Sequence, residues 1–505
     1  MDQISLEEEH MKKTFWLRVL VLALAFFVIF ALPSCNAVDE ETDTEETEDE
    51  EEVDYYPDVE KNDYNTDFNI YMLPMCNYPE YYVLEESDGS IMDEAVYMRQ
   101  ERIKRYLGVE MVRKVDSSLD LAWQTYISVL TTAVMNKDGT LDAMLSHYNG
   151  GIPTLLTEGY LMDFTEIDGI DLEADYWNLE FMESIELKGH QYLGYGDCNI
   201  LYVFLVSFNK QMYEQYAEAP AFGGKTFYDI VRDYEWTFDK MISIANLVYV
   251  DNTGDGKTND DIFGFSAAAW EPYGIFIQSG GMNIMEQDES GSYKVVLHEE
   301  RYASKVSTLI EKLAELSRSD NAWVEYKWDS TGISLTTGRT LMSIYDTMHI
   351  PEYLSYEIDF GVLPLPMYDT AQKDTCGYRN ISLGGYICVP VWLKDAKMVA
   401  ETLEMYNFYS EGVKVTFYEK LLGKQVADVP DDAEMFDIIW NSVSSDVGFT
   451  YGTTSLLDAN GGNSLSACIL KLTDPYSTEG GLSSWFAQRV EPLQVGFDNF
   501  YKQIK

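Results

Sequence analysis

Basic side chains are scarce in this chain. Its 505 residues include 35 Lys and Arg against 86 Asp and Glu, which gives a formal net charge of -51. Nucleic acids and anionic membrane surfaces are bound through basic patches, so this composition argues against both as partners. With 46% hydrophobic and 14% aromatic residues, the chain can nevertheless bury a substantial core.

Cysteine and recognisable catalytic motifs are equally few. Cysteine occurs six times, without a CxxC pair or metal-ligand spacing, so we expect mainly buried free thiols. No HExxH, GxSxG, P-loop or GxGxxG pattern occurs. Paired carboxylates could hydrolyse glycosides, but acidic residues are too abundant here for any one pair to indicate an enzyme. The sequence therefore gives no positive support for catalysis.

The N-terminal apolar run is too short for an ordinary membrane span. It covers 14 residues, 19–32, whereas crossing a bilayer takes roughly 20. Basic residues precede it and Leu32-Pro33-Ser34-Cys35 follows it, as in a secretory signal. Cys35 in this place resembles the lipidated cysteine of bacterial lipoproteins. We expect a signal peptide over 1–34, with Met11 as an alternative start, and weigh an uncleaved membrane helix as the rival interpretation.

An acidic segment follows Cys35. Twelve of the sixteen residues 39–54 are Asp or Glu and none is basic. Such a segment repels itself and cannot bury apolar surface, so it predicts a disordered tether over 35–65. A lipidated Cys35 and this tether would hold a folded body at the extracellular face of a bacterial membrane.

The chain after the acidic segment is predicted to form alternating strands and helices. Strands are predicted at 68–73, from Val109, and at 141–145; helices are predicted from Met92 to Leu107, stopped by Gly108, and at 123–134. This alternation predicts an α/β fold with doubly wound sheets flanked by helices. Ligands of such sheets lie beyond the carboxyl ends of the strands.

Several blocks in a fixed order resemble bacterial extracellular solute-binding proteins of family 1, the sugar type. They are Gly159-Tyr160-Leu161-Met162-Asp163, Gly189-His190-Gln191-Tyr192, Phe208-Asn209-Lys210, Trp236-Thr237-Phe238-Asp239, Gly338-Arg339-Thr340-Leu341-Met342, 359–366 and Gly384-Gly385-Tyr386. The resemblance covers about 66–505. It implies a type II periplasmic-binding-protein-like fold, in which two lobes close on a solute at a hinge. The solute then passes to the permease subunits of an ABC importer.

Carried onto this chain, the resemblance assigns 66–196 plus 328–378 to lobe 1 and 197–327 plus 379–505 to lobe 2. The hinge would lie near 195–197 and 364–366. We expect a monomer that needs no cofactor.

A carbohydrate site needs flat aromatic faces together with amides and carboxylates that bridge neighbouring hydroxyls. Residues of these types at predicted loop ends or lobe crossings are the ligand-binding candidates: Tyr148, Asn149, Asp197, Asn199, Trp270, Glu271, Tyr273, Tyr345, Asp346, Arg379 and Tyr386. Each could equally be an ordinary packing or loop residue, and we expect about half to prove so.

The segment 251–261 resembles a calcium loop. Its predicted ligand positions are Asp251, Thr253, Asp255, Lys257, Asn259 and Asp261. Thr253 replaces the usual Asp or Asn, and Ile262 stands where a bidentate Glu belongs. A metal-free acidic turn is the rival interpretation, and any Ca²⁺ here would be structural.

The sequence thus predicts a lipid-anchored solute-binding protein that captures a carbohydrate, with an oligosaccharide favoured, for an ABC importer. The alternatives are a surface glycan hydrolase and a glycan-binding or sensing lipoprotein without a transporter. Peptides and other solutes also remain open as ligands.

Overall fold

A computed structural model describes most of the chain after the acidic segment. The described residues are 57–72, 78–114, 123–137, 139–147, 151–268, 272–325, 335–356, 358–382, 384–421, 430–452 and 482–504. The predicted signal peptide, Cys35 and most of the predicted tether lie outside these ranges. Within them, no helix is both long enough and apolar enough to span a membrane.

The smaller sheet has the order β12-β3-β1-β2. Its strands are β1 (Thr66–Tyr71), β2 (Val109–Lys114), β3 (Ala143–His147) and β12 (Gly384–Cys388). β1 pairs in parallel with β2 and β3, as the predicted strand-helix alternation requires, whereas β12 is antiparallel to β3. Both β3 and β12 are buried along their whole lengths, so they lie inside the core rather than at its surface.

Helix α2 (Ile91–Leu107) connects β1 to β2 and has a well-defined start and end. The Ser90 hydroxyl accepts from the Asp93 backbone N–H at its N-terminus. Gly108 ends it with φ of 65°, where a Cβ would clash with Asp63, so only glycine fits. The predicted stop at Gly108 is confirmed. The next crossover is α3 (Trp123–Asn136).

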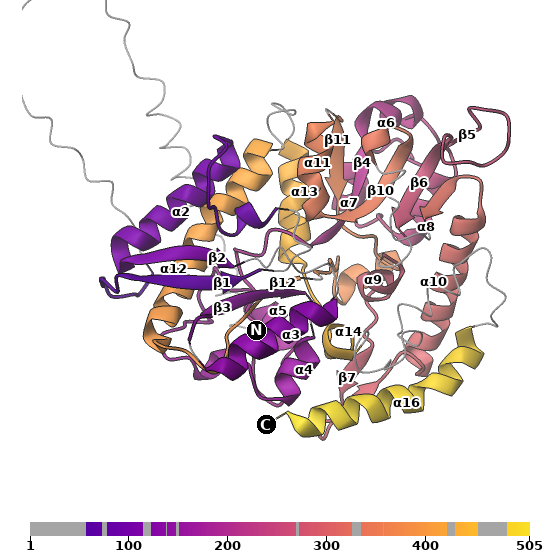
Figure 1. The fold of residues 1–505 in the computed structure, drawn as a ribbon. Helices are drawn as coiled ribbons and strands as arrows, with labels where there is room; N and C mark the ends of the chain where they lie inside the picture. Colours follow the sequence, from indigo (N-terminus) through magenta and orange to yellow (C-terminus); the bar gives the residue numbers. More distant parts are fainter. Residues whose placement is uncertain are drawn as a thin grey trace, which may run out of the picture. The chain divides into compact units, whose positions relative to one another are not determined.

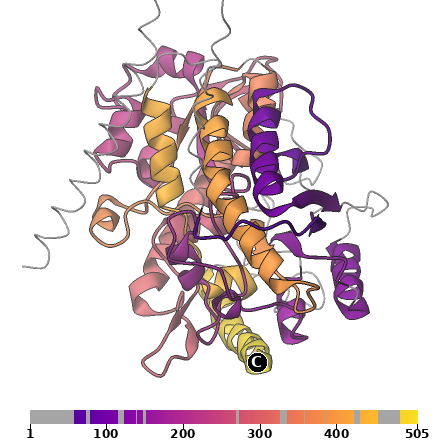
Figure 2. The same cartoon turned by 90° about the vertical axis from the view of Figure 1, so that its left-hand side faces the viewer.

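Helix α12 (Ala396–Val415) lies beside α2 in both views (Figure 1 and Figure 2). Between them the Arg99 guanidinium is buried and lies 4.2 Å from the centre of the Tyr406 ring. Arg99 donates to the Ser410 hydroxyl at 2.7 Å and to the carbonyl oxygens of Tyr81 and Tyr82. These neutral acceptors replace water around the buried cation, so α12 is joined to the loop before α2.

The larger sheet has the order β11-β4-β10-β6-β5, with β9 also paired to β6. Its strands are β4 (Phe204–Asn209), β5 (Tyr249–Val250), β6 (Ile262–Ala268), β9 (Ala322–Glu325), β10 (Thr340–Asp346) and β11 (Phe360–Leu363). β10 runs parallel to β6 and antiparallel to β4, so this sheet is mixed. Both sheets thus have helices around them but are not purely parallel, which refines the prediction (Figure 1).

The other helices are short except for two. They are α4 (Ile152–Thr157), α5 (Leu179–Ser184), α6 (Lys210–Tyr216), α7 (Phe227–Arg232), α8 (Phe238–Ala245), α9 (Pro272–Ser279), α10 (Glu300–Arg318), α11 (Ile350–Ser355), α13 (Pro430–Asn441), α14 (Val447–Gly452) and α16 (Leu482–Gln503). The hairpin β7 (Met285–Gln287) and β8 (Tyr293–Val295) precedes α10. 3-10 turns occur at η1 (Pro79–Tyr81), η2 (Phe164–Glu166), η3 (Leu335–Thr337), η4 (Thr347–His349) and η5 (Thr370–Asp374), and a π-helical turn, η6 (Thr416–Leu421), follows α12.

The two sheets correct the predicted division into lobes. Residues 328–378 were assigned to lobe 1, but β10 and β11 pair with β4 in the larger sheet. Conversely, 379–505 was assigned to lobe 2, but β12 pairs with β3 in the smaller sheet. The first lobe is therefore built on β1, β2, β3 and β12, and the second on the larger sheet. The chain passes between them after β3, after β11 and after α12.

Candidate functional site

The first two crossings between the sheets meet at their C-terminal ends. The first crossing is 196–203 and the second is 364–382. Val203 forms an antiparallel bridge with Ser382, and the Phe204 backbone N–H donates to the Ile381 carbonyl at 2.9 Å. The predicted hinge positions, 195–197 and 364–366, lie at the start of these two segments. Two sheets that are linked by two adjacent segments of the chain can move relative to each other, which is the arrangement of a hinge.

Asn199 fastens the first crossing to the smaller sheet. Its carbonyl oxygen accepts from the Gly196 backbone N–H at 2.8 Å, and its amide nitrogen donates to the Gly385 carbonyl. The side chain is fully buried. It was predicted as a ligand-binding residue, but its polar atoms are occupied by the backbone, so the structure places it as a positioning residue.

Asp197 joins the first crossing to the third. Its carboxylate forms an ion pair with the Lys414 ammonium in the last turn of α12, and both groups are largely buried. Burial raises the pKa of Asp197, and the charge of Lys414 acts in the opposite direction. Just beyond Lys414, Tyr418 in η6 stacks on Phe436 of α13 at a centroid distance of 4.6 Å. The first and third crossings are therefore linked through side chains.

His147 and Tyr202 lie together at the carboxyl end of β3, and sequence reasoning missed both as site residues. Their rings meet edge to face at 5.8 Å, and a Cβ on Gly384 would lie about 3 Å from each ring. Complete burial lowers the pKa of His147 to about 3, so its imidazole is neutral at physiological pH. Tyr202 has φ of 69°, a costly conformation for a residue with a side chain. Local strain of this kind cannot be recognised from residue types.

Tyr345 and Asp346 end β10, where the larger sheet meets the first crossing. Asp346 is buried, and its carboxylate accepts from the Met348 backbone N–H at 3.1 Å and contacts His349 Nδ1 at 3.0 Å. It therefore caps η4. Tyr345 is partly exposed, with its ring 4.2 Å from the His349 ring. Of the pair, only Tyr345 is partly exposed.

Arg379, on the second crossing, is partly exposed and held by neutral groups. Its Nε donates to the Ser444 hydroxyl at 3.0 Å and one terminal nitrogen donates to the Asn283 carbonyl oxygen at 2.9 Å. In the part of the chain that the structure describes, no carboxylate forms an ion pair with it. A guanidinium has five N–H donors, so Arg379 keeps hydrogen-bonding capacity for a ligand.

The remaining predicted ligand residues divide into two groups. Tyr386 is fully buried, and its hydroxyl donates to the Ser382 carbonyl at 2.8 Å, so it belongs to the core beside the crossings. Tyr148, Asn149, Trp270 and Glu271 lie outside the described residues. Tyr273 belongs to the first turn of α9, where only the backbone is described.

The predicted calcium loop is organised by its own backbone. The Asp251 carboxylate accepts from the N–H groups of Thr253 (3.2 Å), Gly254 (2.5 Å) and Gly256 (3.1 Å). The buried Asp261 accepts from the N–H groups of Asn252 and Thr258 at 3.0 and 2.8 Å. The Lys257 ammonium donates to the Ser319 carbonyl, away from the loop. Calcium binding here stays a prediction.

A second contact between the lobes lies at the turn 185–188, which precedes the first crossing. Tyr451 of α14 donates to the Ile185 carbonyl at 3.0 Å, and Tyr293 of β8 donates to the Glu186 carbonyl at 2.8 Å. The Lys188 ammonium reaches the Ile504 carbonyl, just after α16, at 2.5 Å. Two elements from the C-terminal part of the chain, α14 and the end of α16, thus meet one turn of the first lobe together with the β7–β8 hairpin.

Comparison with known proteins gives matches in structure only. No protein-family model and no curated protein sequence matches this chain. The galacto-N-biose-/lacto-N-biose I-binding protein of an ABC transporter from Bifidobacterium longum, in complex with lacto-N-biose, is similar at a TM-score of 0.53 and 12% identity. The match covers 86% of this chain and 97% of that one. The maltose/maltodextrin-binding domain MalE from Bdellovibrio bacteriovorus, bound to maltotriose, is similar at 0.52 and 14% identity, over 86% and 100% of the two chains.

A third similar structure is the GacH receptor of Streptomyces glaucescens, solved without ligand and with acarbose, at a TM-score of 0.50 and 13% identity. That match covers 87% of this chain and 99% of GacH. All three proteins are thus matched over nearly their whole lengths. This chain has the two-lobe α/β fold of the type II solute-binding proteins, with the hinge crossings at 196–203 and 364–382.

Proposed function

We propose that this protein captures a carbohydrate between its two lobes and delivers it to an ABC importer. The observation that supports this most is the pair of adjacent crossings in a fold shared with structures that hold maltotriose, lacto-N-biose and acarbose. A ligand that touches both lobes only when they are closed favours the closed state. The importer would then distinguish the protein with bound ligand from the empty protein by this closed conformation.

Arg379 and Tyr345 are the described side chains best suited to hold the sugar. A guanidinium can donate to two neighbouring hydroxyl oxygens, and a partly exposed tyrosine ring can stack on the apolar face of a pyranose. The two residues lie on different segments, one on the second crossing and one at the end of β10.

The test is calorimetric titration of the intact chain with maltotriose, lacto-N-biose, acarbose and the corresponding monosaccharides. We expect saturable binding of one sugar class, and a loss of at least tenfold in affinity for Arg379→Met. Arg339→Met is the matched control, because Arg339 pairs with the exposed Asp260 and lies away from the crossings. Equal affinity in both variants would remove Arg379 from the site.

The same samples separate a receptor from the alternative of a glycan-active hydrolase. After prolonged incubation, the bound sugar should be recovered intact by chromatography. Steady conversion of the sugar would instead identify the protein as an enzyme. A glycan sensor without a transporter would bind the sugar but fail to support its uptake by cells that carry the cognate permease.

Anchoring and calcium are separate parts of the proposal. Lipidation of Cys35 after removal of 1–34 would place the protein at the extracellular face of the membrane, and intact-mass measurement of the processed chain tests it. Calcium at 251–261 would raise the thermal midpoint relative to chelator, and Asp255→Asn would abolish that rise. A single peak of monomer mass in light scattering would support the expected monomer.

A further inference from the structure

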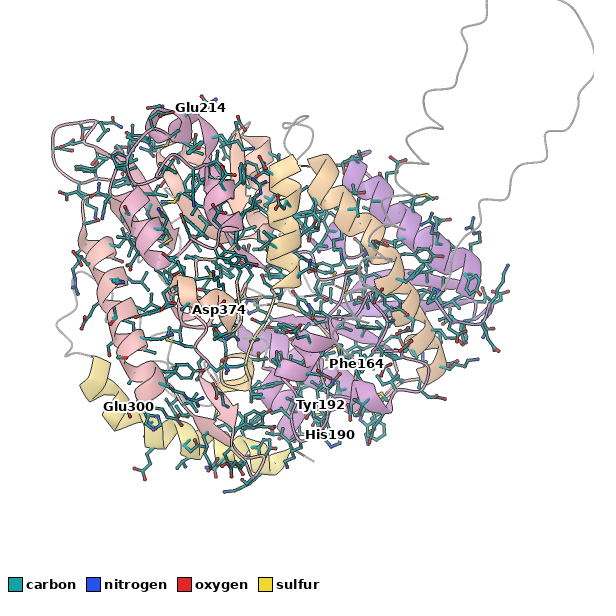
Figure 3. All side chains as sticks on the ribbon, turned by 180° about the vertical axis from the view of Figure 1, so that it is seen from behind. Phe164, His190, Tyr192, Glu214, Glu300 and Asp374 are labelled. Carbon is teal, nitrogen blue, oxygen red and sulfur yellow. The ribbon has the colours of Figure 1, made fainter. Side chains whose placement is uncertain are left out.

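Asp163, Glu166 and His190 come together at the surface of the first lobe. Asp163 caps η2, Glu166 is the last residue of that turn, and His190 closes the hairpin that starts at Leu187. One ligand atom from each of the three lies within 4.8 Å of the others. Figure 3 shows His190 next to Tyr192 and near Phe164 at the edge of the molecule.

The cluster carries negative charge without a permanent cation. The Asp163 side chain is only 5% exposed, and its ion-pair partner at 2.6 Å is His190, which is charged only when protonated. In the described part of the chain, no Lys or Arg forms an ion pair with Asp163 or Glu166.

The hydrogen bonds of Asp163 fix its orientation. Oδ1 accepts from the backbone N–H groups of Thr165 and Gln191 at 3.0 and 2.9 Å. Oδ2 accepts from the Thr165 hydroxyl at 2.7 Å and faces His190 Nδ1. Because the backbone holds Oδ1, the one carboxylate oxygen turned toward His190 and Glu166 is Oδ2. The buried carboxylate is therefore pre-oriented toward the other two groups.

We propose that Asp163, Glu166 and His190 bind a divalent transition-metal ion of the Zn²⁺ type. An imidazole nitrogen with two carboxylate oxygens is a donor set that Zn²⁺ accepts, with water completing the tetrahedron. The ion would take the place of the proton between Asp163 Oδ2 and His190 Nδ1. At bond lengths of about 2.1 Å and a tetrahedral angle, these two atoms would lie about 3.4 Å apart, a widening of under 1 Å from the present 2.6 Å.

Such an ion would join η2 to the hairpin 187–190, whose first two residues also belong to the turn 185–188. The backbone carbonyls of that turn accept hydrogen bonds from the hydroxyl groups of Tyr451 and Tyr293. A metal ion on His190 would therefore stiffen the first-lobe side of this contact, and would do so whether or not the protein binds a carbohydrate. The inference does not rest on the proposed function.

The test is a titration of the intact, chelator-treated chain with Zn²⁺, followed by thermal unfolding and by competition with a chromophoric chelator. The background is Cys376→Ser, which removes an exposed thiol that would also take Zn²⁺. We expect one equivalent bound and a rise in the thermal midpoint. His190→Gln and Glu166→Gln should each weaken binding at least tenfold, and Co²⁺ should give the visible absorption of a tetrahedral site.

Two controls keep the result specific. His298→Gln removes another exposed histidine, and Glu173→Gln removes another exposed carboxylate of the first lobe, and neither should change Zn²⁺ affinity. If His190→Gln unfolds the chain, Glu166→Gln alone decides, because Glu166 is exposed and its side chain forms no hydrogen bond to the described residues. Affinity unchanged in Glu166→Gln, or no Zn²⁺ bound by the parent, would overturn the inference.

Discussion

The first crossing and the turn 185–188 both connect the lobes, but by different means. At the crossing, the covalent chain continues from one sheet to the other, and Asn199 and Asp197 secure it with buried contacts. At the turn, only side chains of Tyr293, Tyr451 and Lys188 bridge the lobes. Contacts of the first kind persist when the lobes move, whereas contacts of the second kind can break. Substitutions at the crossing, which acts as a hinge, should therefore change mainly the free energy of unfolding. Substitutions at the turn, which acts as a contact between closed lobes, should change mainly the conformation.

Asn199→Ala should have the largest effect, because it breaks the crossing and leaves two buried backbone groups unpaired. Gly196 N–H and the Gly385 carbonyl would lose their partner, at a cost of about 2–4 kcal/mol in the free energy of unfolding. Denaturant titration measures it. The control Asn136→Ala, at an exposed position of α3, should stay within about 0.5 kcal/mol. Equal effects would mean that Asn199 does not fasten the crossing.

Lys414→Met should have the next largest effect, because it leaves the largely buried Asp197 carboxylate without its ion-pair partner. We expect a loss of about 2 kcal/mol in the free energy of unfolding, less than for a pair fully removed from water. Adding Asp197→Asn to Lys414→Met should restore part of that loss, because the uncompensated charge is then removed. A double variant that is less stable by the full sum of the two single effects would contradict a direct pairing.

Tyr293→Phe and Tyr451→Phe should each cost only about 1 kcal/mol in the free energy of unfolding, since each removes one hydrogen bond to a carbonyl of the turn. Their effect on conformation should be larger than their effect on stability. Small-angle scattering of the ligand-free protein should show a larger radius of gyration for the double variant than for Tyr302→Phe, a control on α10. An unchanged radius would mean that the turn does not hold the lobes together.

The smallest effect concerns acid stability at Asp163, which contacts His190 and Gln191 just after that turn. Burial alone would raise the pKa of Asp163, but hydrogen bonds from Thr165, His190 and Gln191 outweigh it and hold the pKa below its ordinary value. A depressed pKa in the folded state stabilises the protein above the unfolded-state value of about 3.9, and this contribution is lost as pH falls below it. Asp163→Asn should therefore flatten the dependence of unfolding free energy on pH below about 4. An unchanged slope would contradict this.

The sequence predicted the positions of strands and helices well, but it predicted poorly which strands pair with each other. Strand and helix positions followed from periodicity, and Gly108 marked the end of α2. The lobe assignment failed because β10 and β12 are both buried apolar strands that either sheet could accept. Pairing is a tertiary property, and no local pattern distinguishes the two strands.

The site shows the same limit. Asn199, Asp346 and Tyr386 were chosen as polar or aromatic groups at predicted loop ends or lobe crossings. Asp346 does end β10, and Asn199 lies on the first crossing, whereas Tyr386 lies in the middle of β12. Their burial and their backbone hydrogen bonds could not be predicted, because residue type does not tell whether a polar group at a crossing faces the ligand or the backbone. The cluster at His190 was hidden for a related reason, since its members are 27 residues apart in the chain.

The late return of β12 to the smaller sheet has a consequence for folding. Every strand of the larger sheet lies between residues 204 and 363, so that sheet can assemble as soon as this stretch exists. The smaller sheet must wait for Gly384, which pairs with His147 from far back in the chain. Contacts of such long sequence separation form slowly. Until β12 arrives, the edge of β3 is open to pairing with another chain, so a product truncated before residue 384 should aggregate rather than remain a soluble half-protein.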